Sequence, residues 1–254
     1  MKLRVLGCSG AEMPGHRQTA FLINDNMLLD AGTAASVLDE NAQQQLKHIF
    51  ITHAHLDHVN SVPALVDNLM LSRSPSSIKV YGLKAVLETI RLHLLNDKVW
   101  PDFTKIHNHN TETPVMAYVE IEENTWMDID KVRIKAVPVE HSIPAAGFLL
   151  EEDGRVLLYS GDTGPTESIW NAASQIHTAI VEVSFPSRMN DMAFKTGHLT
   201  PSLLMLELAK MPMPPERLFI SHIKPQYQDE VIDELLAMKM SGLTIIKEDE
   251  VYEI

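Results

Sequence analysis

The chain alternates between segments with strand-like and helix-like hydrophobic patterns. Short apolar runs bounded by Gly and Asn predict strands, whereas longer segments with apolar residues at helical spacing predict helices. The expected strands are Leu3–Leu6, Thr19–Ile23, Met27–Asp30, His48–Thr52, Ile78–Tyr81, Met116–Ile121, Val132–Val139, Gly147–Glu151, Val156–Ser160, Thr178–Val183 and Arg217–Ile220. The expected helices are Val62–Leu71, Val86–Leu95, Ser202–Lys210 and Glu230–Lys239.

The order of these elements is β-rich, helical, β-rich and helical again. It favours an α/β architecture in which two sheets pack face to face with helices outside each, because that arrangement buries both faces of both sheets. No linker rich in Pro and Ser, no repeat and no low-complexity tract divides the 254 residues. We therefore expect a single domain over residues 1–254.

Composition narrows the setting in which the protein works. The single cysteine, Cys8, allows no internal disulfide, which favours a reducing cytoplasm. The first apolar stretch is short and carries charges, and 18 apolar residues never occur in a row, which argues against secretion and membrane spanning. The formal charge of −13 repels polyanions, so a dedicated nucleic-acid surface is not expected.

A cluster of metal-binding residue types directly follows the expected strand His48–Thr52. His53 and His55, two positions apart on an extended segment, point to the same side, and Asp57 and His58 offer an oxygen and a nitrogen to a second ion. Zinc, manganese and iron accept such ligands. A solvated His-rich turn is the alternative, but it does not account for these offsets after a strand.

Four ligands from one loop cannot complete two coordination spheres, so further ligands are expected at later strand ends. His141, Asp162 and His222 each follow an expected strand beside a turn. Any one of them alone could be a turn-capping Asp or a partly buried His. Together with the first cluster, they predict a metal centre.

These motifs resemble those of the metallo-β-lactamase superfamily, and within it the class II cyclic-nucleotide phosphodiesterases over nearly the whole chain. The matching stretches are Thr52–His58, Asn96–Phe103, Glu140–Phe148, Tyr159–Thr166, Glu182–Pro186, Gly197–Thr200 and His222–Pro225. The likeness to the phosphodiesterases rests on the Trp-Pro-Asp-Phe and Ser-Phe-Pro stretches. The resemblance implies a four-layer αβ/βα sandwich with two divalent metal ions, zinc as the first choice and manganese or iron as alternatives.

The resemblance also implies a role for each ligand. By this resemblance, one ion would be bound by His53, His55 and His141, and the other by Asp57, His58 and His222. Asp162 would lie between the two ions. The two ions would hold a hydroxide that attacks a phosphodiester, and Asp57 would help to orient it.

His198 lies outside this ligand set, just before a helix that Thr200 could cap and Pro201 could begin. The resemblance implies that His198 donates a proton to the leaving alkoxide and that Glu182 fixes its tautomer. A solvent-facing His beside a helix start is the alternative.

Three further positions are weighed for supporting roles. Trp100, with Pro101 and Phe103, could form a stacking wall for a purine, although core packing explains these residues equally well. Lys224 could hold a phosphate oxygen, although a lone Lys in a turn is usually solvated. Asp30 is expected to organise the metal loop by hydrogen bonds without touching metal.

Two other patterns are assigned no chemistry. His107 and His109 repeat the spacing of two without a preceding strand, and we interpret them as exposed loop residues. The Met-rich stretch Met205–Met213 predicts helix packing or a homodimer surface.

The leading hypothesis is an enzyme that hydrolyses a small-molecule substrate, 3′,5′-cyclic AMP or GMP, to the nucleoside 5′-monophosphate. A tRNA 3′-processing endonuclease would share the ligands, His198 and Glu182, but would be expected to carry a basic RNA-gripping arm, which is not evident between Gly164 and His222. A non-catalytic metal-binding sensor module is the third hypothesis. It would tolerate gaps in the ligand set, and the set is complete.

Overall fold

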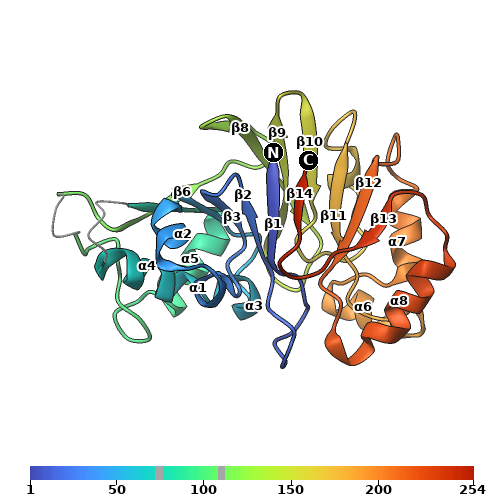
Figure 1. Ribbon diagram of the computed structural model, residues 1–254, viewed down its shortest axis with the longest axis horizontal. Helices are drawn as coiled ribbons and strands as arrows, with labels where there is room; N and C mark the ends of the chain where they lie inside the picture. Colours follow the sequence, from blue (N-terminus) through green and yellow to red (C-terminus); the bar gives the residue numbers. More distant parts are fainter. Residues whose placement is uncertain (72–76, 108–111) are drawn as a thin grey trace.

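The computed structural model describes residues 1–71, 77–107 and 112–254. Within these residues the strands form two mixed sheets of seven strands each, and helices cover the outer sides at the left and right of Figure 1. The four layers are those of the αβ/βα sandwich expected from the sequence. The N-terminal and C-terminal strands pair with each other, so both ends of the chain lie at the centre of Figure 1.

The first sheet carries the first predicted metal loop. Its consecutive strands β1, β2 and β3 form an antiparallel meander, and β4, β5 and β6 extend the sheet in parallel. The strands are β1 (Lys2–Gly7), β2 (Ala20–Ile23), β3 (Met27–Leu29), β4 (His48–Phe50), β5 (Ile78–Gly82), β6 (Met116–Glu120) and β14 (Val251–Glu253). The helices are α1 (Ala34–Val37), α2 (Glu40–Gln45), α3 (Leu56–Val59), α4 (Val62–Leu71) and α5 (Lys84–His93).

The second sheet carries the later predicted ligands. Strands β7 to β10 are antiparallel neighbours, and β10 to β13 run parallel. The strands are β7 (Trp126–Ile129), β8 (Val132–Val139), β9 (Ala145–Glu152), β10 (Arg155–Tyr159), β11 (Thr178–Glu182), β12 (Arg217–Ser221) and β13 (Leu243–Ile245). The helices are α6 (Asn190–Thr196), α7 (Pro201–Leu208) and α8 (Gln228–Ala237), with short 3₁₀ turns at Ile169–Asn171, Ser187–Met189 and Pro225–Tyr227.

The larger hydrophobic core contains aliphatic and aromatic side chains from both sheets. The Phe21 ring meets the Tyr159 ring edge-on at 5.3 Å, and Phe50 meets Phe148 in the same way at 5.8 Å. Fully burying such a side chain contributes roughly 1.5–3 kcal/mol. The packing therefore fixes the two sheets against each other, together with the loops that leave them.

The loops that carry the predicted ligands meet at one edge of the sandwich. Parallel strands end on the same side, so the segments after β10, β11 and β12 are neighbours. The segment after β4 joins them from the other sheet, because the Ala146 amide of β9 donates a hydrogen bond of 3.0 Å to the Thr52 carbonyl.

Several residues weighed in the sequence have structural roles. Phe103 is fully buried and belongs to the core. His107 is exposed, as predicted, and His109 lies outside the described residues. Met205 and Met213 are partly exposed, at 43% and 49%. No helix in the described part of the chain has both the length and the apolar character that crossing a bilayer requires.

Candidate metal centre

All seven predicted ligands come together at the edge where the two sheets meet. They form two groups, and within each group the ligand atoms lie within 4.8 Å of one another. The first group is His53, His55 and His141, and the second is Asp57, His58, Asp162 and His222. They come from the segment between β4 and α3, from α3 itself, and from the segments that follow β8, β10 and β12.

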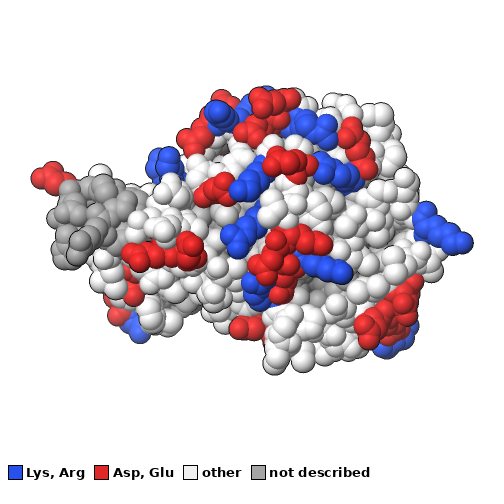
Figure 2. All heavy atoms as spheres, in the orientation of Figure 1, with Lys and Arg blue, Asp and Glu red and all other residues white. Residues whose placement is uncertain are grey.

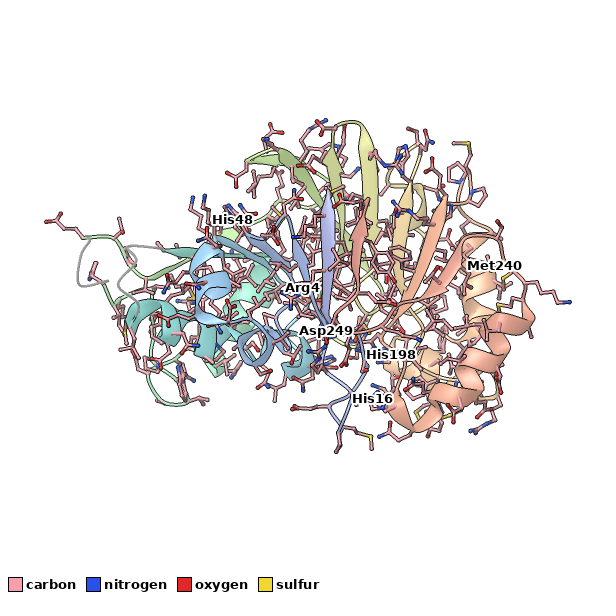
Figure 3. The ribbon with its side chains drawn as sticks, viewed as in Figure 1. Arg4, His16, His48, His198, Met240 and Asp249 are labelled. Atoms are coloured by element: carbon pink, nitrogen blue, oxygen red, sulfur yellow. The ribbon has the colours of Figure 1, made fainter. Side chains whose placement is uncertain are left out.

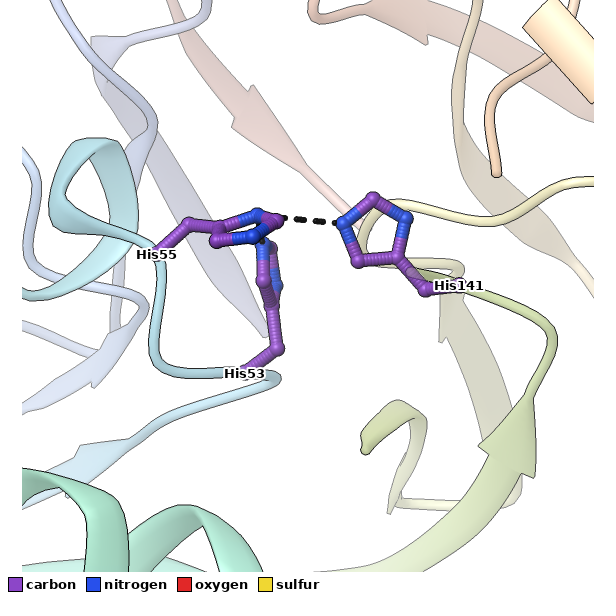
Figure 4. A group of neighbouring side chains, drawn as sticks. All are labelled: His53, His55 and His141. Atoms are coloured by element: carbon purple, nitrogen blue, oxygen red, sulfur yellow. Dashed lines mark hydrogen bonds between the residues drawn. The ribbon is translucent and has the colours of Figure 1, made fainter. Parts of the chain in front are cut away.

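Three imidazole nitrogens of the first group converge on one point (Figure 4). Nε2 of His53 lies 3.0 Å from Nδ1 of His55, and Nε2 of His141 lies 3.1 Å from the same atom. A tetrahedral ion with bonds of about 2.0–2.1 Å holds ligand nitrogens roughly 3.3 Å apart. The spacing of the three nitrogens therefore fits a metal ion.

Hydrogen bonds on the far side of the rings turn these nitrogens towards the site. Nδ1 of His141 donates to the Gly197 carbonyl at 2.7 Å, and Nδ1 of His53 lies 3.0 Å from Oγ1 of Thr52. Burial lowers the pKa of His53, His55 and His141. The three imidazoles therefore favour the neutral form, which is the form that binds metal.

Asp162 faces both groups. Its Oδ2 lies 3.3 Å from Nε2 of His222, 3.4 Å from Nε2 of His58 and 3.7 Å from Nε2 of His53. Burial opposes ionisation of Asp162, but the neighbouring His222 and His58 hold its pKa well below the usual range. Asp162 therefore presents a carboxylate oxygen to ligand nitrogens of both groups, and its bridging role stays a prediction.

Asp57 completes the second group from α3. Its Oδ2 lies 3.4 Å from Nε2 of His222 and 3.9 Å from Nε2 of His58. Burial would raise the pKa of the Asp57 carboxyl, but the neighbouring His222 and His58 outweigh this effect and lower it. Because its side chain keeps about a quarter of its exposure, Asp57 is open to water as well as to a metal ion.

Asp30 organises the site from behind without belonging to either group, as predicted. It is fully buried and accepts hydrogen bonds from the Thr52 amide at 2.8 Å, Nδ1 of His58 at 2.7 Å and the Tyr159 hydroxyl at 2.6 Å. The Thr52 hydroxyl donates to it as well, at 2.9 Å. One carboxylate therefore fixes the orientation of a ligand and joins both sheets.

The change Asp30→Ala is expected to lower the free energy of unfolding by about 3–5 kcal/mol, because it leaves buried donors unpaired. Denaturant unfolding with a chelator present measures this without any contribution from metal. Asp25→Ala is the matched control: Asp25 shares the left-handed backbone, with φ of 61° against 55°, but its side chain is 60% exposed. A loss from Asp30→Ala no larger than that of the control would contradict the assigned role.

His198 lies beside both groups, near the lower edge of the strands in Figure 3. Its Nδ1 donates to Oε1 of Glu182 at 2.7 Å, and the ring stacks at 5.6 Å on the ring of His222. Burial would lower the pKa of His198, but the Glu182 carboxylate raises it above its usual value. The Thr200 side chain caps α7 and Pro201 begins it, as predicted.

The Ser184 hydroxyl connects His198 and Glu182 to the second ligand group. Its Oγ lies 3.0 Å from Oε2 of Glu182, 3.2 Å from Nδ1 of His198 and 3.0 Å from Nδ1 of His222. The hydroxyl donates to the carboxylate and accepts from the ring nitrogen of His222. This leaves Nε2 of His222 facing Asp57 and Asp162.

Neither of the two residues weighed as substrate contacts belongs to the ligand groups. Trp100 is 41% exposed in the segment after α5, where its backbone pairs with Leu95. Lys224 lies two residues after His222, and its Nζ donates to the Gly10 carbonyl at 2.8 Å. Both contacts stay predictions.

Apart from Asp30, sequence reasoning missed the residues that orient the ligands. Thr52 and Ser184 lie inside matching stretches next to a ligand or to Glu182, so their position was a usable signal. Tyr159 begins the matching stretch Tyr159–Thr166, but nothing near it in the sequence indicates that its hydroxyl reaches Asp30. The Gly197 carbonyl likewise gives no signal before folding.

Three enzymes of related sequence align with most of the chain. It is 27% identical over 210 residues to a probable 3′,5′-cyclic-nucleotide phosphodiesterase of Yersinia pestis, covering 73% of this chain and 59% of that protein's length. It is 27% identical to a 3′,5′-cyclic-nucleotide phosphodiesterase of Aliivibrio fischeri, covering 80% and 73% of the two chains. A Ribonuclease Z of Prochlorococcus marinus is 25% identical, covering 77% and 76%.

Solved structures share the fold at lower identity. Unliganded yeast PDE1 matches with a TM-score of 0.82 at 15% identity over 98% of both chains. The metallo-beta-lactamase fold protein YhfI of Bacillus subtilis matches with a TM-score of 0.79 at 17% identity over 99% of both chains. The family model of the beta-lactamase superfamily domain matches residues 25–223. The chain therefore belongs to the beta-lactamase superfamily and is a metal-dependent hydrolase with the metallo-β-lactamase fold.

Proposed function

We propose that the protein hydrolyses 3′,5′-cyclic nucleotides to nucleoside 5′-monophosphates. The observation that carries the proposal is the His198–Glu182 pair, held by a hydrogen bond of 2.7 Å beside two groups of metal ligands. A proton donor next to such a centre suits a reaction that expels a poor leaving group, and a sugar alkoxide is one. The two relatives named as cyclic-nucleotide phosphodiesterases support this choice.

The ligand groups indicate what the centre would bind. His53, His55 and His141 would hold one divalent ion, the second group would hold another, and Asp162 would touch both. Two such ions would activate water near neutral pH and neutralise charge on the phosphoryl oxygens. Zinc, manganese and iron all accept these nitrogen and oxygen donors.

The chain's own groups position the reactants and move the proton. Asp57, open to water, accepts a hydrogen bond from the attacking water and turns its lone pair towards the phosphorus. His198 donates the proton of Nε2 to the leaving 3′ oxygen, since its Nδ1 is already engaged with Glu182. In this proposal the Lys224 ammonium attracts a phosphate oxygen.

A tRNA 3′-processing activity is the second candidate, because a Ribonuclease Z is among the relatives. The charge distribution disfavours it. Between Gly164 and His222 the basic residues are Arg188, Lys195, Lys210 and Arg217. Arg188 pairs with Glu230, and Lys210 pairs with Glu207 and Glu167. Figure 2 also shows Lys and Arg interspersed with Asp and Glu over the visible face.

A non-catalytic sensor is the third candidate. A module that only binds metal needs the ligands and has no use for a proton donor with a dedicated carboxylate partner. His198 and Glu182 are both buried and hydrogen-bonded to each other, and the two ligand groups are complete without them, although a ligand atom of His198 also lies within 4.8 Å of those of His141 and Asp162. This pairing beside the ligand groups favours catalysis over sensing.

One experiment separates the three functions. Protein loaded with zinc, manganese or iron is incubated side by side with cyclic AMP, cyclic GMP, 2′,3′-cyclic nucleotides and pre-tRNA, and turnover is measured. Faster turnover of the 3′,5′-cyclic nucleotides is expected. Cleavage of pre-tRNA alone would establish the nuclease, and no turnover with any metal would favour the sensor.

A further inference from the structure

A cavity of about 630 Å³ opens beside the first ligand group. His141 and Ser142 line one side of it, and Phe194 and Lys195 of α6 line another. The volume falls within the roughly 300–1,000 Å³ typical of small-molecule sites. The cavity is therefore large enough for the nucleoside part of a nucleotide whose phosphate lies at the ligand groups.

Helix α6 connects this cavity to the reacting groups. Gly197 ends the helix with φ of 71°, and its carbonyl accepts the hydrogen bond from Nδ1 of His141. A Cβ at this position would lie 2.7 Å from the Cα of His141, so glycine is required for the close approach. Phe194 and Lys195 occupy the last turn of α6, and His198 follows Gly197 directly.

Phe194 is unusually exposed for a large aromatic side chain. Its exposed fraction is 69%, although Ala193 next to it is fully buried. Leaving a phenyl ring in water forgoes the stabilisation that burial would give. An exposed ring at the edge of a cavity is available to stack on a flat ligand.

Lys195 supplies a cation beside that ring. Lys210, on the opposite side of the cavity, already pairs with Glu207 and Glu167 and donates to the Thr166 carbonyl. In the described parts of the chain, no ion pair within 4.0 Å includes Lys195. Its ammonium group can therefore serve an anionic ligand in a protein with a net charge of −13.

We propose that this cavity is the nucleoside-binding site, in which Phe194 stacks on the nucleobase and Lys195 attracts the nucleotide's negative charge. The inference rests on the proposed function. In a 3′,5′-cyclic nucleotide the leaving oxygen belongs to the sugar, and the base is attached to the same sugar. If His198 protonates that oxygen, the sugar and base lie on the His198 side of the ligand groups, which is the side of α6 and the cavity.

The test compares binding of adenosine 5′-monophosphate with binding of ribose 5-phosphate, which lacks the base, to metal-loaded protein by titration calorimetry. Phe194→Ala is expected to weaken binding of the nucleotide by about 5- to 100-fold and to leave binding of ribose 5-phosphate unchanged, because stacking acts on the base alone. Lys195→Ala is expected to weaken binding of both ligands by a similar, smaller factor, because it acts on their shared charge.

Leu206→Ala is the matched control, since Leu206 lies on α7, is 63% exposed and does not line the cavity. Phe194→Tyr keeps a flat ring and is expected to retain nucleotide binding. Equal binding of the nucleotide by Phe194→Ala and wild type, or equal weakening of both ligands, would overturn the assignment. The proposed function would fail in a different way. In that case the wild type would not turn over cyclic nucleotides, whatever its relative affinity for the two ligands.

Discussion

The change His198→Ala is expected to lower turnover of cyclic AMP by about 100- to 10,000-fold, the usual contribution of a positioned proton donor. Bis(p-nitrophenyl) phosphate expels a stable phenolate, which needs little protonation, so its turnover should be largely spared. Metal content should stay at the wild-type level, because His198 is not needed to complete either ligand group. Steady-state kinetics on both substrates and elemental analysis measure these effects.

Two further variants show whether His198 acts as proton donor or as ligand. Glu182→Gln should produce a milder form of the same substrate bias, since it disturbs the orientation of His198 without deleting the acid. His222→Ala removes a ligand, so it should lose metal and slow both substrates. Equal slowing of the two substrates by His198→Ala would exclude proton donation, and loss of metal would place His198 among the ligands.

The change Asp162→Ala is expected to empty at least one metal site and to lower turnover of every substrate. Oδ2 of Asp162 lies within 3.7 Å of ligand nitrogens from both groups, so its loss affects both. A metal ion contributes several kcal/mol to stabilising charge in the transition state, and the loss of one corresponds to a factor on the order of 10³ in rate. Elemental analysis and kinetics with the activated aryl substrate measure the two effects together.

Asp102→Ala is the control for this change. Asp102 is also a buried carboxylate, but its partners are Thr104 and Lys105. It should keep the wild-type metal content. If Asp162→Ala kept both its metal and its activity, the bridging position would be wrong, and the division of ligands between two ions would have to be redrawn.

Much of the fold could be predicted because the hydrophobic pattern is local information. Strand β8 and helix α4 have the predicted bounds, since each combines an apolar pattern with clear ends. Strand β14 was missed because it has only three residues, and what makes it a strand is pairing with β1 at the other end of the chain. Helix α6 was missed because only Ala193 within it is buried, which leaves little apolar periodicity.

The convergence of the seven predicted ligands could be anticipated because each is a metal-binding residue type on a segment that follows a strand. The residues that hold the ligands could not be predicted in the same way. Asp30 was expected to act by hydrogen bonds, but its contact with Tyr159 joins positions 129 residues apart. Similarly, the exposure of Phe194 becomes informative only once α6 is placed beside the cavity.

The most direct test of the central claim is the identity of the product formed from cyclic AMP by metal-loaded protein, measured by chromatography against standards. If the ligand groups and His198 act together on the 3′ oxygen, adenosine 5′-monophosphate should be the sole product. Formation of adenosine 3′-monophosphate, or no cleavage with zinc, manganese or iron, would contradict the account.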